Sequence, residues 1–263
     1  MKKLKIRGII LRKFFVENKN ILLSENKIII DGEDVNHIKN VLRLEIGTSI
    51  KICDKEKVIN YISKISKINN DNIECEIIEE VSSDTEKNVE LHIYQGLPKA
   101  DKMELIIQKG TELGISKFIP VKLSRCIVKL DGKDEIKKID RWNKISEVAA
   151  KQSGRDMIPK VRNIESVKNI ANQVNDYDLF LVAYENEKEN YIKNELLEIK
   201  PKKDTYKIAV VIGPEGGIDE QEIDILKDAG AHIISLGRRI LRTETVALQV
   251  ASIIMYELEN GGK

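Results

Sequence analysis

The sequence predicts a mixed α/β protein in which a small β-barrel-like domain precedes a larger domain built on a parallel β-sheet. Short β segments separated by Asn, Asp and Gly turns fill the chain up to about residue 81. Beyond residue 82, apolar strands alternate with helical patterns, and several of these strands are apolar on both faces. Such strands are typical of a parallel sheet that helices cover on both sides. We therefore expect two domains, residues 1–81 and 82–263.

The N-terminal domain is expected to be mostly β. Its clearest β segments lie at residues 27–30, 49–53 and 73–78. One helix is expected at residues 34–44, because apolar residues recur there at helical spacing and Gly47 follows as a stop. The polar run 82–88 then marks the domain boundary.

The C-terminal domain is expected to alternate strands with helices. Strands are predicted at residues 89–95, 118–121, 179–183, 207–212 and 232–236. Helices are predicted at residues 100–113, 135–152, 166–174, 220–229 and 245–258. Alternation of this kind builds parallel sheets from βαβ units.

Composition excludes several classes of protein. No apolar run approaches the roughly 18 residues that a membrane span requires. The apolar stretch 8–11 is too short for a secretion signal and runs into Arg12 and Lys13. The three cysteines form no C-x-x-C pair and the three histidines are scattered, which predicts no metal site and a reducing, cytoplasmic location.

Positive charge is concentrated locally, although the formal net charge is only +1. The first thirteen residues carry six Lys and Arg residues and no acid, and residues 238–242 hold three arginines. Nucleic acid would therefore bind to patches rather than to a global field. On charge alone, a solvated basic face explains the same residues equally well.

The strongest site signal is the turn Gly213-Pro214-Glu215-Gly216-Gly217, which follows the apolar strand 207–212. Glycines let a ligand approach the backbone closely, and ligands bind at the carboxyl ends of strands in open α/β sheets. The turn matches neither the P-loop nor the dinucleotide-binding pattern, so we expect backbone groups to hold the ligand. The structural alternative is a strand-to-helix turn, with a helix starting at Ile218 or Asp219.

A second turn leaves the strand 232–236 and reads Leu236-Gly237-Arg238-Arg239-Ile240-Leu241-Arg242-Thr243-Glu244-Thr245. Thr243 or Thr245 is suited to cap the last helix, and Glu244 suits its first turn because of the helix dipole. Capping does not account for three arginines beside two apolar residues. Arginines in this place are suited to contact phosphate or to stack on a base.

Two further polar segments have structural explanations of their own. The helix that follows Lys99 carries a polar face that includes Lys109, as a solvated helix does. Gln152 and Arg155 close another helix, where they either reach a substrate or cap the helix end.

Several segments along the chain match one family together. They are Lys13-Phe14-Phe15-Val16, His37-x-x-x-Val41-Leu42-Arg43, Gly96-Leu97-Pro98-Lys99, residues 108–114, Ser124-Arg125-Cys126 and Gln152-Ser153-Gly154-Arg155. The two turns at residues 213–217 and 236–245 complete the set and are its most specific members. With these motifs the chain resembles the RsmE family of 16S rRNA uracil-N3 methyltransferases, which belongs to the SPOUT class.

The resemblance implies a PUA-like RNA-binding β-barrel, a trefoil-knotted SPOUT domain, S-adenosylmethionine as the methyl donor, 16S rRNA of the 30S subunit as the substrate, and a homodimer. It implies donor binding by Val182, Ala183, Glu185, Gly213, Pro214, Glu215, Gly216, Gly217, Leu236, Gly237, Ile240 and Leu241. For the reaction it implies, Arg242 or Arg239 is suited to stabilise the anion that uracil forms on losing the N3 proton, and Glu244 is a candidate catalytic base or orienting group. It implies RNA contacts for Arg12, Lys13, Arg43, Lys99, Lys109, Arg125, Gln152 and Arg155.

Two alternatives stay open beside this reading. One is another SPOUT activity, such as ribose 2′-O-methylation, and the other is a non-catalytic RNA-binding or ribosome-assembly factor.

The sequence departs from the family pattern near its start. Lys13 stands where family members commonly carry arginine, with Arg12 beside it, and lysine and arginine side chains are not equivalent in bidentate contacts. Residues 1–10 precede the usual start of the family, and we expect them to be an extension without function.

Overall fold

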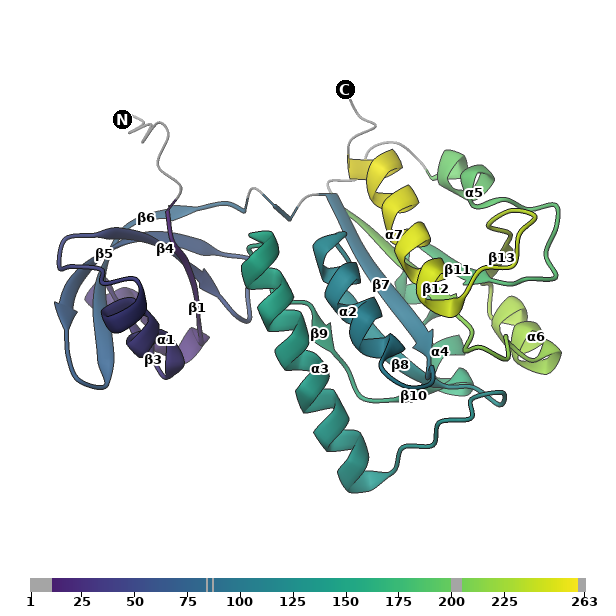
Figure 1. Cartoon of the computed structure of the whole chain (residues 1–263). Coiled ribbons are helices and arrows are strands. Elements are labelled where there is room, and N and C mark those ends of the chain that lie inside the picture. Colours follow the sequence, from purple (N-terminus) through teal and green to yellow (C-terminus); the bar gives the residue numbers. More distant parts are fainter. Residues whose placement is uncertain (1–10, 84, 87, 200–204, 260–263) are drawn as a thin grey trace. The chain divides into compact units, whose positions relative to one another are not determined.

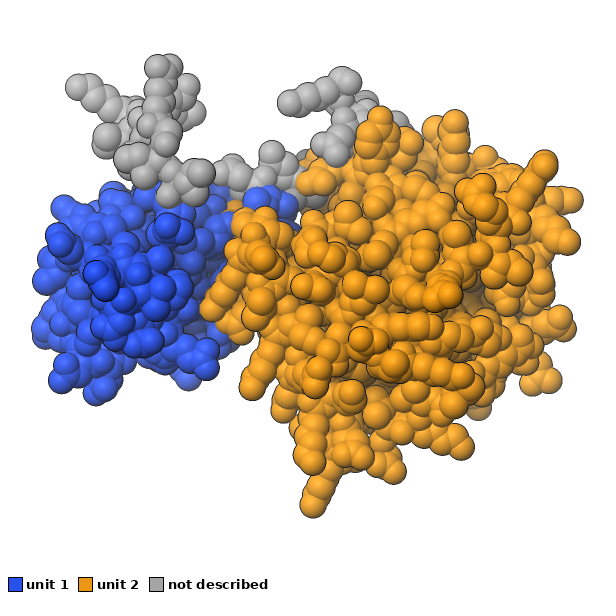
Figure 2. Space-filling model, in the orientation of Figure 1, with its two compact units in different colours: residues 1–86 blue, residues 87–263 orange. Residues whose placement is uncertain are grey.

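A computed structural model describes residues 11–83, 85–86, 88–199 and 205–259. The chain divides into two compact units, Met1–Glu86 and Lys87–Lys263 (Figure 2). Each unit has its own sheet and its own core. The extension expected at residues 1–10 lies outside the described residues.

The first unit is a curled six-stranded sheet with the strand order β1-β4-β5-β6-β3-β2 (Figure 1). Its strands are β1 (Lys13–Val16), β2 (Ile21–Leu22), β3 (Lys27–Asp31), β4 (Ser49–Asp54), β5 (Asn60–Ile68) and β6 (Asn72–Val81). β1 pairs with β4 in parallel, and the other pairs are antiparallel. Alternate strand residues such as Ile28, Ile52 and Ile73 are fully buried and form the core, which confirms the predicted β domain.

The helix expected at residues 34–44 is shorter than predicted. A single turn of α1 (Glu33–Asn36) passes into a π-helical turn, His37–Val41, and helical structure ends there. Arg43 has a φ of 51°, in the left-handed region that a continuing right-handed helix does not use. Ile38 is nevertheless buried, so the apolar spacing identified the correct inward face.

The second unit is a sheet in which every strand pair is parallel. Its order is β10-β8-β7-β12-β11-β13, with β9 paired to β8. The strands are β7 (Asn88–Gly96), β8 (Lys117–Lys122), β9 (Lys160–Val161), β10 (Glu165–Ser166), β11 (Leu179–Ala183), β12 (Thr205–Ile212) and β13 (His232–Ile234). The parallel sheet confirms the predicted α/β class.

Helices cover both faces of this sheet (Figure 1). They are α2 (Lys102–Glu112), α3 (Gly132–Ser153), α4 (Val167–Ala171), α5 (Ile192–Glu198), α6 (Glu220–Asp228) and α7 (Thr243–Glu259). The core on one face contains side chains of α2, α3, α5 and α7, and the core on the other contains side chains of α4 and α6. Within the described residues, no helix combines the length and the apolar composition that crossing a membrane demands.

The helix expected at residues 166–174 is interrupted. Ser166 is its N-cap, with the side chain accepting a hydrogen bond from the Asn169 N–H, and α4 ends at Ala171. A separate 3-10 turn, Val174–Asp176, then leads into β11. Val167, Ile170 and Val174 are all buried, so the predicted apolar face is present, but it is divided between two short elements.

The register places four strand ends side by side. Gln95 of β7 is paired with Ile212 of β12, Ile212 with Ala183 of β11, and Ala183 with Ile234 of β13. Because all four strands are parallel, their carboxyl ends lie together, and the loops that follow these ends start along one edge of the sheet.

Gly110 of α2 gives a test of how closely this helix packs against the core. A Cβ at this position would lie 2.5 Å from Ile115 Cδ1 and 2.9 Å from Phe118 Cε1, and both side chains are fully buried. Alanine normally stabilises a helix relative to glycine by about 1 kcal/mol. Here we expect Gly110→Ala to lower the free energy of unfolding by about 1–3 kcal/mol, because the core has no room for the methyl group. Urea denaturation measures the change; exposed Gln108→Ala on the same helix is the control and should be near neutral.

Candidate active site

A cavity of about 470 Å³ lies at the edge where these strands end. It is lined by Lys102, Ala183, Tyr184, Glu185, Ile212, Gly213, Pro214, Glu215, Gly217, Ser235, Leu236, Gly237, Arg238, Arg239, Ile240, Leu241, Arg242, Thr243 and Val246. The volume lies in the range of small-ligand pockets, and the walls combine apolar side chains with backbone and charged groups.

The turn after β12 forms one wall of the cavity. The Gly217 N–H donates to the Pro214 carbonyl at 3.0 Å, which closes the turn. Gly217 has a φ of 71°, and a Cβ there would collide with the Glu185 carboxylate. Glycine is therefore required at this position by both the backbone conformation and the close approach of Glu185.

The chain after β13 forms the opposite wall. The Ser235 N–H donates to the Asn190 carbonyl at 2.7 Å, and the Ile192 N–H donates to the Ser235 carbonyl at 3.3 Å. The loop is therefore anchored where it begins. Beyond this anchor Ile240 is 90% exposed, and its arginine neighbours are exposed as well.

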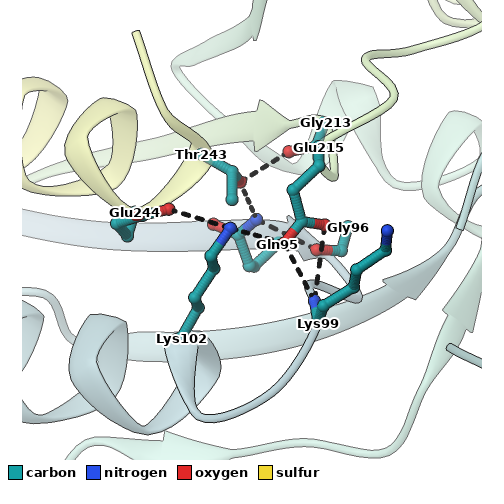
Figure 3. A network of polar contacts seen from close by, with 8 residues as sticks. All are labelled: Gln95, Gly96, Lys99, Lys102, Gly213, Glu215, Thr243 and Glu244. Carbon is teal, nitrogen blue, oxygen red and sulfur yellow. Dashed lines mark hydrogen bonds and ion pairs between the residues drawn. The ribbon is translucent and has the colours of Figure 1, made fainter. Parts of the chain in front are cut away.

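Thr243, the first residue of α7, joins three elements (Figure 3). Its hydroxyl donates to the Gly213 carbonyl at 2.6 Å and accepts a hydrogen bond from Gln95 Nε2 at 2.8 Å. Gln95 also donates to the Gly96 carbonyl at 3.0 Å and is fully buried. The end of β7, the turn after β12 and the start of α7 are thus held together by buried hydrogen bonds.

A second polar network lies beside it (Figure 3). The Glu215 carboxylate accepts hydrogen bonds from the Lys99 N–H at 3.1 and 3.3 Å and from Lys102 Nζ at 2.7 Å. The same Lys102 ammonium lies 3.7 Å from Glu244 Oε2. Lys102 therefore stands between two carboxylates, one from the turn after β12 and the other from the first turn of α7.

The ionisation of this network follows from its contacts. Partial burial disfavours the charged form of Glu215, but the hydrogen bonds from Lys102 and from backbone N–H groups outweigh it, and the pKa of Glu215 lies below its ordinary value. The hydrogen bond to Glu215 in turn raises the pKa of Lys102. Both groups are therefore charged at neutral pH.

The structure brings most of the predicted site residues together. All of the predicted donor-binding residues except Val182 and Gly216 line the cavity, and so do Arg239 and Arg242. Val182 is fully buried in the core on the α4 and α6 side of the sheet. The carbonyl of Gly216 accepts a hydrogen bond from Arg125 at 3.3 Å. Glu244 lies within contact distance of Lys102.

Sequence reasoning missed Gln95 and Lys102 as site residues. Gln95 is a polar residue at the carboxyl end of a buried strand, which is the signal that identified the turn at residues 213–217, so the same rule finds it. Lys102 carries no such signal, because it meets Glu215 and Glu244 only through the tertiary fold. Both residues lie within four positions of Lys99, which was predicted to contact RNA.

Among the residues expected to touch RNA, Arg155 is a correction. It is 5% exposed, and its Nη1 donates to the Thr111 carbonyl at 3.0 Å and to the Ile115 carbonyl at 2.6 Å. These carbonyls lie at and just beyond the end of α2, so the buried guanidinium caps that helix instead of facing RNA.

The other expected RNA contacts lie at or near the surface. Lys99 and Gln152 are exposed, Lys109 pairs with Glu112 at 2.9 Å, and Arg125 pairs with Asp219 at 3.2 Å. In the first unit, Arg12 and Arg43 are exposed, and Lys13 is half-buried.

Comparison with known proteins identifies the family. Residues 85–255 match the RNA methyltransferase domain, and residues 30–78 match the RNA methyltransferase PUA domain. The chain is 37% identical to the ribosomal RNA small subunit methyltransferase E of Bacillus subtilis (strain 168), over 95% of this chain and 98% of that protein. The chain belongs to the ribosomal RNA small subunit methyltransferase E family. This confirms the resemblance that the motifs carried.

Two further relatives support the assignment. The ribosomal RNA small subunit methyltransferase E of Mesomycoplasma hyopneumoniae (strain 232) is 31% identical over 90% of this chain and 95% of that protein. The crystal structure of a ribosomal RNA small subunit methyltransferase E from Neisseria gonorrhoeae, bound to S-adenosyl methionine, has a TM-score of 0.76 and 28% identity, and covers 93% of this chain and 97% of that one.

Thr243 gives a test of the architecture around the cavity. Thr243→Val keeps the shape of the side chain but removes the hydroxyl that the Gly213 carbonyl accepts from and that Gln95 Nε2 donates to, so that Nε2 retains only the Gly96 carbonyl. We expect the free energy of unfolding to fall by about 1–3 kcal/mol, the cost of buried unsatisfied polar groups. Thr243→Ser keeps the hydroxyl and should lose less. Chemical denaturation measures both variants, and equal losses would show that the hydroxyl is unimportant.

Proposed function

We propose that this methyltransferase transfers a methyl group from S-adenosylmethionine to N3 of a uridine in 16S rRNA. The observation that carries the proposal is the cavity at which the two family motifs, residues 213–217 and 236–245, meet at the carboxyl ends of β11, β12 and β13. Membership of the family supports the substrate, and the donor-bound relative from Neisseria gonorrhoeae supports the donor.

The cavity suits this donor in size and chemistry. S-adenosylmethionine has no phosphate, and the nearby N-terminus of α6 is already satisfied by its own carboxylates, Asp219 and Glu222. Leu236, Ile240 and Leu241 offer apolar walls for the adenine ring, and the open glycine backbone offers hydrogen-bonding groups. The Glu185 and Glu215 carboxylates also line the cavity and supply negative charge there.

The chain's part in the reaction is to position the base and to handle one proton. When bound, the donor supplies a methyl group on a sulfonium, and the carbon–sulfur electron pair returns to sulfur as the bond to N3 forms. Neutral uracil N3 carries a hydrogen, so the N–H bond must break and leave its electron pair on nitrogen. The resulting anion is delocalised onto the ring oxygens, where Arg242 or Arg239 stabilises it. The Glu244 carboxylate accepts the proton.

Charge at the cavity mouth suits an RNA substrate. Arg238, Arg239 and Arg242 are exposed and have no ion-pair partner among the described residues, so their guanidinium groups are available to phosphate or to a base. The PUA domain and the surface residues expected to touch RNA offer further positions for RNA contacts, each within its own unit. The target base leaves its stack to enter the cavity.

The proposal includes a trefoil knot, a homodimer and a cytoplasmic location. The bonds of Ser235 to the 190–192 loop and of Thr243 to Gly213 fit a C-terminal segment held between two earlier loops. Ile240 and Tyr256 are 90% and 71% exposed, which suits coverage by a second copy of the chain. Light scattering that returns the mass of one chain would contradict the dimer.

Mass spectrometry of the reaction product tests the activity. The protein is incubated with S-adenosylmethionine and 30S subunits from a strain that lacks it, and the rRNA is digested to nucleosides. We expect a methyl group on the uracil base. A methyl group on the ribose would favour 2′-O-methylation, and failure to bind S-adenosylmethionine in calorimetry, with or without RNA, would favour a non-catalytic RNA-binding factor.

Arg242 tests the anion-stabilising role. Arg242→Ala should lower the rate of methylation at least about 100-fold, because the loss of one positioned hydrogen-bond donor to a developing anion typically lowers the rate by about that factor. The side chain is exposed, so the melting temperature should stay the same. The exposed Arg162→Ala, outside the cavity, is the matched control and should retain full activity. A near-normal rate for Arg242→Ala would remove this residue from the mechanism.

A further inference from the structure

The glycine-rich turn after β12 is held differently in its two halves. In the first half, the Gly213 carbonyl accepts a hydrogen bond from Thr243 at 2.6 Å (Figure 3), and the ring of Pro214 restricts the backbone that follows. The second half contains Gly216 and Gly217. Two consecutive glycines leave the peptide group between them free to rotate, unless another part of the protein binds it.

Arg125 binds the second half of the turn from outside the cavity. Its Nη1 donates to the Gly216 carbonyl at 3.3 Å, and its Nη2 donates to the Asp219 carboxylate at 3.2 Å. Among the described residues, no other group donates to the Gly216 carbonyl. Neither Arg125 nor Gly216 lines the cavity, whereas Gly217 does. Arg125 therefore acts on the cavity wall through the backbone of the turn.

The peptide group that joins the two glycines is bound at both ends. The Gly216 carbonyl and the Gly217 N–H belong to one planar unit. Arg125 binds the carbonyl, and the N–H donates to the Pro214 carbonyl at 3.0 Å. With both ends bound, the peptide group has one orientation. Without Arg125, rotation of this group would change the part of the cavity wall that Gly217 forms.

The loop that carries Arg125 is itself fastened to the start of α6. The Ser124 N–H donates to Glu222 Oε1 at 2.8 Å, and the Ser124 hydroxyl donates to Glu222 Oε2 at 3.1 Å. A Cβ on Gly216 would lie 3.1 Å from Arg125 Cβ, so the loop and the turn are in close contact. Glu222 also forms the capping box of α6 with Asp219. The loop after β8 is therefore a fixed support for the turn.

The charge of Arg125 is matched within the protein. Arg125 forms an ion pair with Asp219, whereas Arg238, Arg239 and Arg242 have no ion-pair partner among the described residues. The planar guanidinium is suited to bind two acceptors at once, which a lysine ammonium does not reproduce. A guanidinium that already binds two protein acceptors is less available to a phosphate group.

We infer that Arg125 is a positioning residue for donor binding: it fixes the peptide group between Gly216 and Gly217, so that the turn has its binding shape before the donor arrives. The inference rests on the proposed function, because it takes the cavity as the donor site. A turn that is ordered beforehand loses less conformational entropy when the donor binds. The family motif implies an RNA contact for Arg125, but the contacts of this side chain assign it to the turn.

Calorimetry with S-adenosylmethionine in the absence of RNA tests the inference. We expect Arg125→Ala to raise the Kd by about 3- to 30-fold. The upper value corresponds to freeing the backbone of one residue, and the lower value allows for water, which replaces part of an exposed ion pair. Arg125→Lys keeps the charge but not the two-acceptor geometry, so it should raise the Kd as well. Lys129→Ala removes one charge from an exposed side chain of the same loop and should keep the wild-type Kd.

Steady-state methylation of 30S subunits separates this role from an RNA contact and from a purely structural one. Arg125→Ala should raise the KM for S-adenosylmethionine, with kcat at saturating donor and the KM for 30S subunits near their wild-type values. An RNA contact would instead raise the KM for 30S subunits and weaken its dependence on salt. A purely structural role would lower the melting temperature and all activity together.

The outcomes that contradict the inference are distinct from failure of the proposed function. A wild-type donor Kd in Arg125→Ala or in Arg125→Lys would overturn the inference, and so would either of the two alternative kinetic patterns. Arg125→Gln provides the same comparison should Arg125→Ala not fold. If the wild-type protein binds no S-adenosylmethionine, the proposed function itself fails, and this is seen before any variant is compared.

Discussion

The hydrogen bonds of the Thr243 hydroxyl are the constraint on which the site depends. Through them the start of α7 is fixed to the Gly213 carbonyl and to Gln95 of β7. Four charged groups lie on segments that leave this junction: Glu215 on the turn, Arg242 and Glu244 beside Thr243, and Lys102 on α2 after β7. Because the junction is buried and each hydrogen bond has a defined geometry, the side chains around it are held in fixed positions.

The cations of the site fall into two groups with different chemistry. Lys102 is half-buried and held by two carboxylates, so its charge is balanced within the protein. The arginines of residues 238–242 are exposed and line the cavity mouth without an ion-pair partner among the described residues. A balanced inner pair orders the site, whereas unbalanced outer guanidinium groups attract a polyanion. This division explains why a chain of net charge +1 is suited to bind RNA.

Local patterns predicted the fold and much of the cavity. The strand at residues 179–183 has the predicted bounds, and the glycine-rich turn does follow a strand apolar on both faces. Contacts between residues far apart in the sequence could not be predicted in this way. The family motif implies an RNA contact for Arg155, but its hydrogen-bond partners, the carbonyls of Thr111 and Ile115, lie about forty residues earlier in the chain. The roles of Gln95 and Lys102 likewise exist only because distant segments meet at one sheet edge.

The capped N-terminus of α6 explains why this edge of the sheet suits a ligand without phosphate. In phosphate-binding α/β proteins, free N–H groups at a helix start attract the anion. Here the Gln221 N–H donates to Asp219 at 3.1 Å, and Glu222 accepts from the N–H groups of Asp219 and Ser124 at 3.3 and 2.8 Å. A phosphate would meet two carboxylates at this place, and their repulsion would outweigh a weak dipole. The glycine turn is left to present its backbone to the cavity instead, so recognition depends on shape, apolar contact and peptide groups.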